Sequence, residues 1–265
     1  MFNRRNRILL KELVRTDFKL RYQGSVIGYI WSVLKPLMLF AVMYVVFIYF
    51  LRFGQDVPHF AVALLLGMVI WSFFTETTSL GMQSIVVRGD LLRKLSFPTE
   101  IIVLSITINA LINLLISLII VFIFGLINKV EVSSMILTLP LLLIELFAFS
   151  LGVAFILATI YVRFRDIGPI WEVLLQIGMY MTPIIYPVSL VMNINTRAAK
   201  LLMLNPMAQI IQDIRHFGTS PVNITVWQLI ENKWIACIPY IIPFITLFVG
   251  YYIFNKNSKK FAEIV

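Results

Sequence analysis

The chain has 265 residues, of which 60% are hydrophobic and only 13% are charged, and it carries a net charge of +9. Soluble domains are about 45–50% apolar and about 25% charged, so one soluble core of this size cannot bury so much apolar surface. The composition also excludes a disordered chain, a collagen-like fibre and a disulfide scaffold. The sequence therefore predicts an all-α polytopic membrane protein, in which a basic excess first indicates Lys- and Arg-rich cytoplasmic loops rather than nucleic acid.

The N-terminal segment, residues 1–28, has helical periodicity but too many charges to cross a membrane. Its apolar residues, including Ile8, Leu13 and Phe18, share one broad face, while Arg15 lies off that face. This pattern predicts an amphipathic helix that lies in the membrane interface. Such a helix is either a plain membrane anchor or a gate at the cytoplasmic mouth of a path, and both interpretations remain open.

Six apolar stretches follow, each close to the roughly 20 residues that a spanning helix needs. They cover residues 29–51, 60–85, 101–127, 136–162, 170–192 and 234–254, and a tail of residues 255–265 comes after them. Sixteen of the 22 Lys and Arg residues fall in or beside the N-terminal segment, in the loops after the second and fourth stretches, and in the tail. This distribution predicts that both termini and those two loops are cytoplasmic.

The loop after the second stretch, residues 86–98, mixes leucines with charges and ends at Pro98. It predicts a short cytoplasmic helix closed by the proline. Exposed apolar side chains on such a helix indicate docking onto a partner protein. The alternative is a short amphipathic loop that rests on the bilayer.

The longest extracytoplasmic region begins at Pro183 and ends at Lys233. Pro183 and Pro187 break the fifth apolar stretch, and broken backbone at membrane depth is tolerated only where protein or water covers it. Asn205 and Pro206 form an N-cap and first-turn pattern, which predicts a short helix from Pro206 to His216. We interpret the region as a helix that turns back before it crosses completely, followed by this short helix. One kinked helix followed by a surface loop is the alternative.

No pattern in the sequence indicates catalysis or cofactor binding. There is no phosphate-binding Gly-x-x-x-x-Gly-Lys-Ser/Thr and no His-Glu-x-x-His, and only His59 and His216 are present. We therefore predict no catalytic residue and no metal site. Glu76, Glu145 and Glu172 lie within apolar stretches, where an ionisable residue is a functional candidate by default. No basic partner lies at mid-depth, so contacts between helices are favoured over a proton relay.

Aromatic residues make up 14% of the chain, and several of them cluster. They serve either as interfacial belts and packing residues or as stacking platforms for sugar rings along a path, and periodicity does not distinguish the two. The candidates for such a path are Tyr29, Trp71, Phe73, Phe74, Tyr180 and Tyr186.

Four phrases resemble the permease subunit of type-2 ABC transporters that export cell-surface polysaccharides. They are residues 17–31 followed by Lys35-Pro36, the run Arg-Phe-Arg-Asp-Ile at 163–167, the run Thr-Pro-Ile-Ile-Tyr-Pro at 182–187, and Asn-Pro-Met at 205–207 with Arg215 after it. All four occur in the order found in that family, and the resemblance covers essentially the whole chain. Any one phrase is weak, whereas the set is specific.

The resemblance implies a homodimer in a bacterial cell membrane, bound to two separate ATPase subunits that hold ATP and Mg²⁺. Members of that family export O-antigen, teichoic acid or rhamnose-rich wall glycans, typically attached to a polyprenyl lipid. A rival function, a sugar flippase driven by an ion gradient, would need inverted repeats and partnered acids within the membrane, and neither is evident. A membrane glycosyltransferase or acyltransferase would need a catalytic His or an acidic metal-binding pair at the membrane edge, and none is evident.

The resemblance also assigns three groups of site residues. The cytoplasmic mouth would contain Arg21, Tyr22, Ser25, Gly28 and Trp31. The coupling helix to the ATPase would contain Arg88, Asp90, Leu91, Leu92, Arg93 and Lys94. The extracytoplasmic gate, made of re-entrant helices between the fifth and sixth spans, would contain Pro183, Tyr186, Pro187, Asn205, Pro206 and Arg215.

Overall fold

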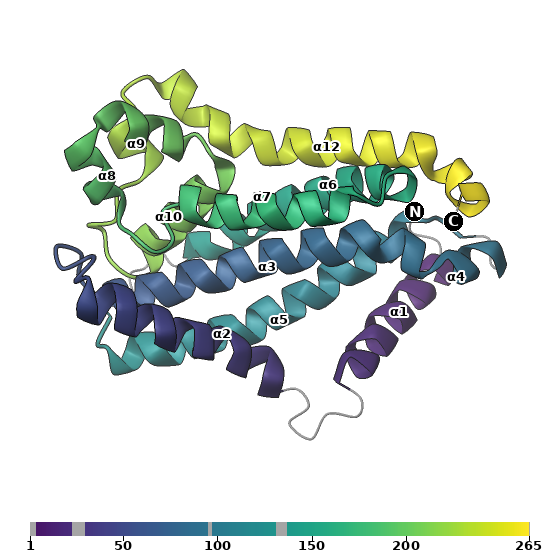
Figure 1. The fold of residues 1–265 in the computed structure, drawn as a ribbon, viewed down its shortest axis with the longest axis horizontal. Coiled ribbons are helices and arrows are strands. Elements are labelled where there is room, and N and C mark those ends of the chain that lie inside the picture. The colour runs from purple at the N-terminus through teal and green to yellow at the C-terminus, as the bar shows by residue number, and fades with distance from the viewer. Residues whose placement is uncertain (1–3, 23–29, 95–96, 131–136, 265) are drawn as a thin grey trace.

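The structure is a computed structural model that describes residues 4–22, 30–94, 97–130 and 137–264. In these ranges every regular element is a helix, which confirms the all-α class. Four helices are long and apolar enough to cross a membrane: α3 (Phe60–Val87), α5 (Glu100–Ile127), α6 (Leu139–Arg163) and α12 (Lys233–Ile264). Helix α3 contacts both α5 and α6, and α6 contacts α12. The long helices therefore lie side by side in the order α5, α3, α6 and α12 (Figure 1).

The other two predicted spans take different forms. The first becomes α2 (Ile30–Met43), which continues as the π-helix η1 (Tyr44–Phe50). The fifth, predicted over residues 170–192, becomes α7 (Ile167–Met181), a helix of 15 residues. At 1.5 Å per residue α7 is about 22 Å long, less than the roughly 30 Å of a bilayer's hydrocarbon core. The prolines therefore end the fifth helix early.

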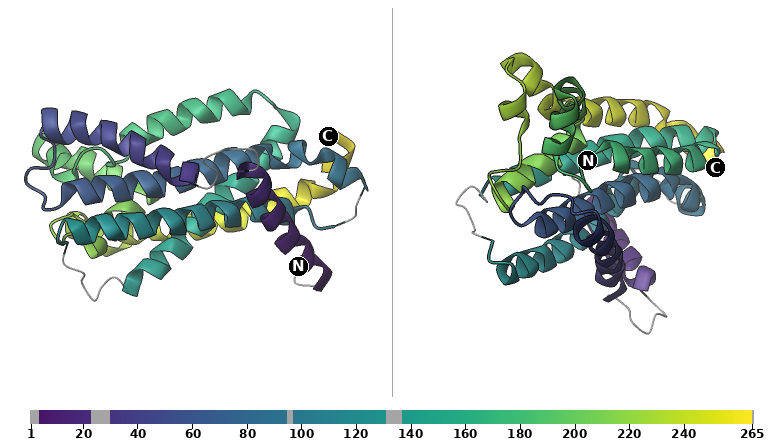
Figure 2. Two further views of the ribbon diagram at one scale, coloured as in Figure 1. Left: turned by 90° about the horizontal axis from the view of Figure 1, so that it is seen from below. Right: turned by 60° about the vertical axis from the view of Figure 1, so that its left-hand side comes forward.

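One end of the bundle gathers three elements that are distant in sequence. These are the start of α1 (Arg4–Tyr22), the short helix α4 (Gly89–Lys94) and the end of α12. We call this the α4 end. Helix α1 packs on α5 and runs at a steep angle to the long helices (Figure 2). The sequence predicted both the N-terminal helix and the short helix after the second apolar stretch.

The opposite end, which we call the α10 end, is built from short helices: α8 (Val188–Ile194), α9 (Thr196–Met203), α10 (Pro206–Gly218) and α11 (Val226–Leu229). The side chain of Asn205 accepts a hydrogen bond from the Met207 amide at 3.0 Å, and Pro206 takes the first position of α10. The predicted cap is thus confirmed, and α10 extends two residues beyond the predicted end. These separate short helices replace the kinked helix and surface loop of the alternative interpretation.

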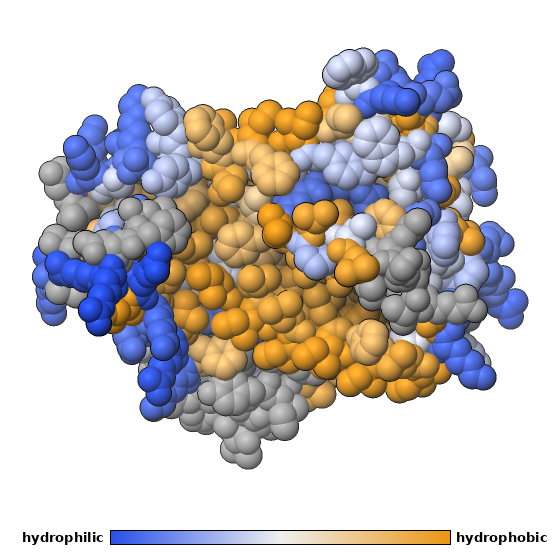
Figure 3. All heavy atoms as spheres, turned by 180° about the vertical axis from the view of Figure 1, so that it is seen from behind, coloured by the Kyte–Doolittle hydropathy of each residue, from blue (hydrophilic) through white to orange (hydrophobic). Residues whose placement is uncertain are grey.

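The surface between the two ends is apolar. Orange side chains cover most of the middle of the face in Figure 3, which also holds a small blue and pale patch, and blue side chains collect toward both ends. On α5 and α12, large side chains such as Ile119, Phe122 and Phe248 are exposed. A surface of this kind is stable against lipid rather than water, which agrees with the membrane class inferred from composition.

Helices α6 and α12 meet backbone to backbone through two glycines. A Cβ placed on Gly152 would lie 2.5 Å from the backbone nitrogen of Leu247. One placed on Gly250 would overlap the carbonyl oxygen of Gly152. Small residues at helix contacts allow this close approach in membrane proteins, where dispersion contacts rather than hydrophobic burial hold helices together.

Candidate functional site

The α10 end is held by one fully buried side chain, Arg215 of α10. Its Nε atom donates to the carbonyl of Ala63 on α3 at 2.8 Å. Its Nη1 and Nη2 atoms donate to the carbonyls of Pro183 and Ile184 at 2.5 and 2.6 Å. Each arm of the guanidinium therefore has a backbone acceptor, and the side chain joins α10 to α3 and to the turn after α7.

These acceptors exist because α7 stops at Met181. Thr182 has extended backbone and precedes a proline, which disfavours continuation of the helix. The carbonyls of the turn then lack helical partners and need a donor if they are buried. Space for that donor comes from Gly67 of α3, where a Cβ would lie 2.6 Å from Nη2 of Arg215. The break in α7 and the buried arginine are two parts of one arrangement.

The other predicted gate residues lie around the same turn. The hydroxyl of Tyr186 donates to the carbonyl of Tyr180 at 2.9 Å. The Asn205 amide donates to the Thr182 hydroxyl at 3.4 Å, which ties the start of α10 to the end of α7. Pro187 and Pro206 are buried next to these residues. The structure thus brings together all six residues that the resemblance assigned to a gate.

Sequence reasoning missed a polar cluster behind this turn. The amide nitrogen of Gln209 on α10 lies 2.9 Å from a carboxylate oxygen of Asp213 and 3.5 Å from one of Glu145 on α6. The hydroxyl of Tyr240 on α12 donates to Asp213 at 2.6 Å. Burial raises the pKa of the Asp213 carboxyl above its ordinary value. Of this cluster, the sequence singled out only Glu145, because it lies in an apolar stretch. Its observed contact is with another helix.

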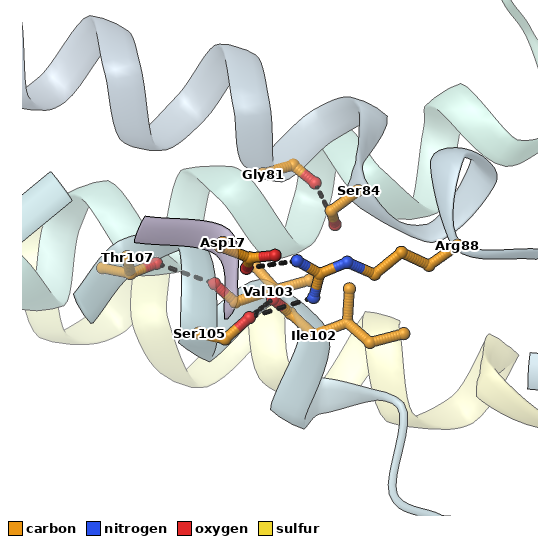
Figure 4. Close-up of polar contacts among 8 residues, drawn as sticks. All are labelled: Asp17, Gly81, Ser84, Arg88, Ile102, Val103, Ser105 and Thr107. Atoms are coloured by element: carbon orange, nitrogen blue, oxygen red, sulfur yellow. Dashed lines mark hydrogen bonds and ion pairs between the residues drawn. The ribbon is translucent and has the colours of Figure 1, made fainter. Parts of the chain in front are cut away.

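At the α4 end, Arg88 joins three helices. It follows α3 directly and precedes α4, and its guanidinium forms an ion pair with Asp17 of α1. It also donates to the hydroxyl of Ser105 on α5 at 3.1 Å (Figure 4). Arg88 was expected on a docking surface. The structure instead directs its side chain toward α1 and α5, because both of its partners lie within the bundle.

The rest of α4 has a buried side and a charged, exposed side. Leu92 is 9% exposed and belongs to a core cluster that includes Phe254 and Phe261 of α12. Leu91 is half-buried, whereas three charged residues, Asp90, Arg93 and Lys94, are exposed. Because α4 folds back on the end of α12, its buried leucine faces inward and its charged side chains face outward.

The candidate path aromatics separate into two groups. Trp71, Phe73 and Phe74 of α3 are buried in the main core, and the ring of Phe74 stacks on that of Phe149 with centroids 5.5 Å apart. Their burial favours the packing interpretation. Tyr180 is exposed and Tyr186 is half-buried. Tyr29 lies outside the described residues.

The predicted cytoplasmic mouth is only partly described. Trp31 on α2 is exposed, and Arg21 and Tyr22 form the last residues of α1. Ser25 and Gly28 lie outside the described residues. Within the described ranges, no three His, Cys, Asp or Glu side chains are grouped so that they could hold a metal ion.

Long apolar helices with shorter helices at both ends define this chain as a polytopic helical membrane protein. The profile of the family described as "ABC-2 type transporter" matches residues 8–217, and the chain belongs to that family. It is 31% identical over 202 residues, 76% of each chain, to the O-antigen export system permease protein RfbA of Myxococcus xanthus. It is 28% identical over 261 residues to an O-antigen export system permease protein RfbA of Klebsiella pneumoniae, covering 97% of this chain and 95% of the relative.

Proposed function

We propose that this chain is the transmembrane subunit of an ATP-driven exporter, which moves a lipid-linked polysaccharide from the cytoplasm to the outer face of the bacterial cell membrane. The observation that carries the proposal is the match to O-antigen export permeases along nearly the entire chain. Family membership supports a role in transport rather than in catalysis.

Two ATPase subunits and a second copy of this chain complete the proposed transporter. The ATPases bind ATP and Mg²⁺, because this chain carries no phosphate-binding motif. The α4 end is cytoplasmic, since the basic residues concentrate there. In this arrangement α2 with η1 forms the first of six spans, and α7 with the turn after it forms the fifth, whose prolines mark the extracytoplasmic gate.

The proposed mechanism starts at the exposed charges of α4. ATP binding draws the two ATPases together, and their motion reaches the permease at Asp90, Arg93 and Lys94. Arg88 then passes the motion to α1 and α5 through the ion pair and hydrogen bond described above. The helices at the dimer axis move apart, and the aromatic faces of Tyr180 and Tyr186 make weak, repeated contacts that let a sugar chain slip past.

The proposal is tested in cells that lack this chain. Glycan synthesis should continue while the product accumulates inside, and a partner ATPase without its phosphate-binding lysine should give the same phenotype. Loss of synthesis itself would instead indicate a transferase. Export that collapses with the proton gradient while ATP is held constant would indicate an ion-driven flippase and contradict the proposal.

A further inference from the structure

The polar cluster behind the turn after α7 contains two buried carboxyl groups. Glu145 of α6 is 5% exposed and Asp213 of α10 is 3% exposed. The side-chain nitrogen of Gln209 lies 3.5 Å from an oxygen of the first and 2.9 Å from an oxygen of the second, so a single amide group bridges them. Two negative charges this close repel each other strongly where water does not screen them. The arrangement is therefore unfavourable if both carboxyl groups are ionised.

The cluster also has fewer hydrogen-bond donors than acceptors. Its donors are the amide nitrogen of Gln209 and the hydroxyl of Tyr240, which donates to Asp213 at 2.6 Å. One oxygen of Glu145, one of Asp213 and the side-chain oxygen of Gln209 make no hydrogen bond to any part of the chain that the structure describes. A buried acceptor without a donor destabilises the folded state. At least one further donor is therefore needed among these oxygens.

A bound proton corrects both the repulsion and the missing donor. The three unpartnered oxygens are buried atoms with almost no surface that a water molecule could touch. A bridging water or a metal ion needs such space, whereas a proton does not. Protonation removes one of the two charges, and it turns one carboxyl from an acceptor alone into a group that also donates. Close carboxyl pairs in other proteins share one proton for the same reason.

The helices that pack on α10 do not offset the second negative charge. They are α6, which carries Glu145 itself, and α3, α9 and α12. Helix α3 has no ionisable residue from Phe60 to Thr75. Lys200 of α9 lies 3.7 Å from the carboxylate of Glu231. Helix α12 contributes the hydroxyl of Tyr240, which donates a hydrogen bond but no positive charge.

Helix α10 itself carries two basic residues beside the pair. Arg215 donates to three backbone carbonyls rather than to a carboxylate. Burial raises the pKa of the Asp213 carboxyl above its ordinary value. The hydrogen bonds from Tyr240 and Gln209 and a positive charge on His216 act in the opposite direction, with smaller effects. The surroundings of the pair therefore favour its protonated state.

We propose that Glu145 and Asp213 together bind one proton in the folded protein, and that this proton helps to hold α10 against α6. The two carboxyl groups belong to different helices, so the O–H of the protonated one adds a donor to the contact between them. The remaining carboxylate carries the single negative charge of the pair, and the two groups titrate as a unit. This proton site follows from the geometry of the cluster and does not depend on the proposed export function.

Infrared spectroscopy of the full chain tests for the proton directly. The chain is held in dodecyl maltoside micelles, because this detergent contains no carbonyl group that would obscure the signal. Ordinary carboxyl groups have pKa values near about 4 and are ionised at about pH 7.5. The C=O stretch of a protonated carboxyl at that pH therefore reports a buried acid. The wild type should show this band, and the double variant Glu145→Gln with Asp213→Asn should lose it.

The matched control is Glu100→Gln, which removes another buried carboxyl. Glu100 is 9% exposed and lies in the first turn of α5, where the helix dipole favours the charged form of an acid. This variant should therefore keep the wild-type band. Absence of the band from the wild type, or an undiminished band in the double variant, would overturn the proposal.

Thermal unfolding at two pH values provides a second measurement. The unfolded chain releases carboxyl protons near about pH 4, whereas the folded pair retains one, so stability falls as the pH rises from there toward the folded-state pKa. The unfolding midpoint of the wild type should be higher at about pH 5.5 than at about pH 8. The double variant should lose at least half of this difference, and Glu100→Gln should keep it. An equal pH dependence in the wild type and the double variant would contradict the shared proton.

Discussion

Arg215 shows how a single side chain holds a broken helix in place. Its planar guanidinium group presents several N–H donors in fixed directions. Three of them donate to the carbonyls of Ala63, Pro183 and Ile184. A lysine has a compact head group and cannot reach three divergent acceptors from one position. The geometry of the guanidinium, rather than its charge alone, therefore stabilises the α10 end.

We expect Arg215→Lys to destabilise the protein by on the order of 3 kcal/mol, since at least one buried carbonyl loses its donor. Thermal unfolding in detergent should show a lower midpoint, and export should fall with it. The control is Arg197→Lys on the exposed face of α9, which should unfold like the wild type. If Arg215→Lys were as stable as the wild type, the three hydrogen bonds would not hold this end together.

The sequence identified Arg215 through its place in a family pattern, but not its partners. Backbone carbonyls such as those of Ala63 and Ile184 have no residue signature, because every residue carries one. Gln209 and Asp213 were missed for a related reason. They are ordinary polar residues in an amphipathic helix until Tyr240, distant in sequence, packs against them.

At the scale of elements, the contact between α6 and α12 depends on the absence of side chains at Gly152 and Gly250. An alanine in a helix is intrinsically better than glycine by about 1 kcal/mol. A substitution that nevertheless destabilises the protein would therefore report a steric conflict between the helices.

Gly152→Ala should lower the unfolding temperature, because its Cβ would lie 2.5 Å from backbone that cannot move aside. Gly125→Ala on α5 is the matched control, since its Cβ would meet Val62 at 3.8 Å, an ordinary contact distance. The control should unfold at or above the wild-type temperature. Equal stability of the two variants would contradict the backbone contact.

The ion pair between Asp17 and Arg88 makes a second prediction at this scale. Asp17→Asn should reduce export and the coupling of ATP hydrolysis to it, because α1 loses its charged contact with the end of α3. The doubly exchanged variant Asp17→Arg with Arg88→Asp should recover part of the loss. ATPase activity and export are measured together in proteoliposomes, with the exposed loop variant Asp56→Asn as the control.

If the charge exchange recovered nothing while Asp17→Asn was defective, the pairing would not be the cause of the defect.

Local sequence could not have identified this pair. The periodicity of α1 predicts an apolar face, but it does not say that Asp17 will lie against another helix. For the same reason Leu92 looked like an exposed docking residue until the end of α12 covered it.

At the scale of the whole molecule, the two ends differ in construction. At the α10 end, short helices are held together by hydrogen bonds that involve backbone carbonyls and buried side-chain amides. At the α4 end, the helices are rich in charged residues. The basic residues predict that the α4 end faces the cytoplasm.

Cysteine labelling checks this orientation, because Cys237 is the chain's one cysteine. In a Cys237→Ser background, Glu231→Cys at the α10 end should react with a membrane-impermeant maleimide in intact protoplasts. Lys256→Cys near the α4 end should react only after permeabilisation. Both positions are exposed, so the reverse pattern would show that the orientation is inverted.

Composition and charge predicted the class, and apolar runs predicted the four long helices well, because a buried or lipid-facing helix must be apolar along its length. The first predicted span is helical over residues 30–50, with a change to π-helix at Tyr44, whereas the fifth was predicted with the wrong shape. A hydropathy pattern shows where apolar residues lie but not where the helix ends, and the prolines near Thr182 end α7 well before its apolar stretch does.

The order of residues in the Arg215 arrangement has a consequence for how the protein is made. The acceptors at Ala63, Pro183 and Ile184 are all synthesised before the donor at Arg215. A nascent chain that has emerged only as far as α9 therefore carries carbonyls that its own donor cannot yet satisfy. The α10 end can therefore close only after α10 has been translated, and a chain truncated before Arg215 leaves these three carbonyls without this donor.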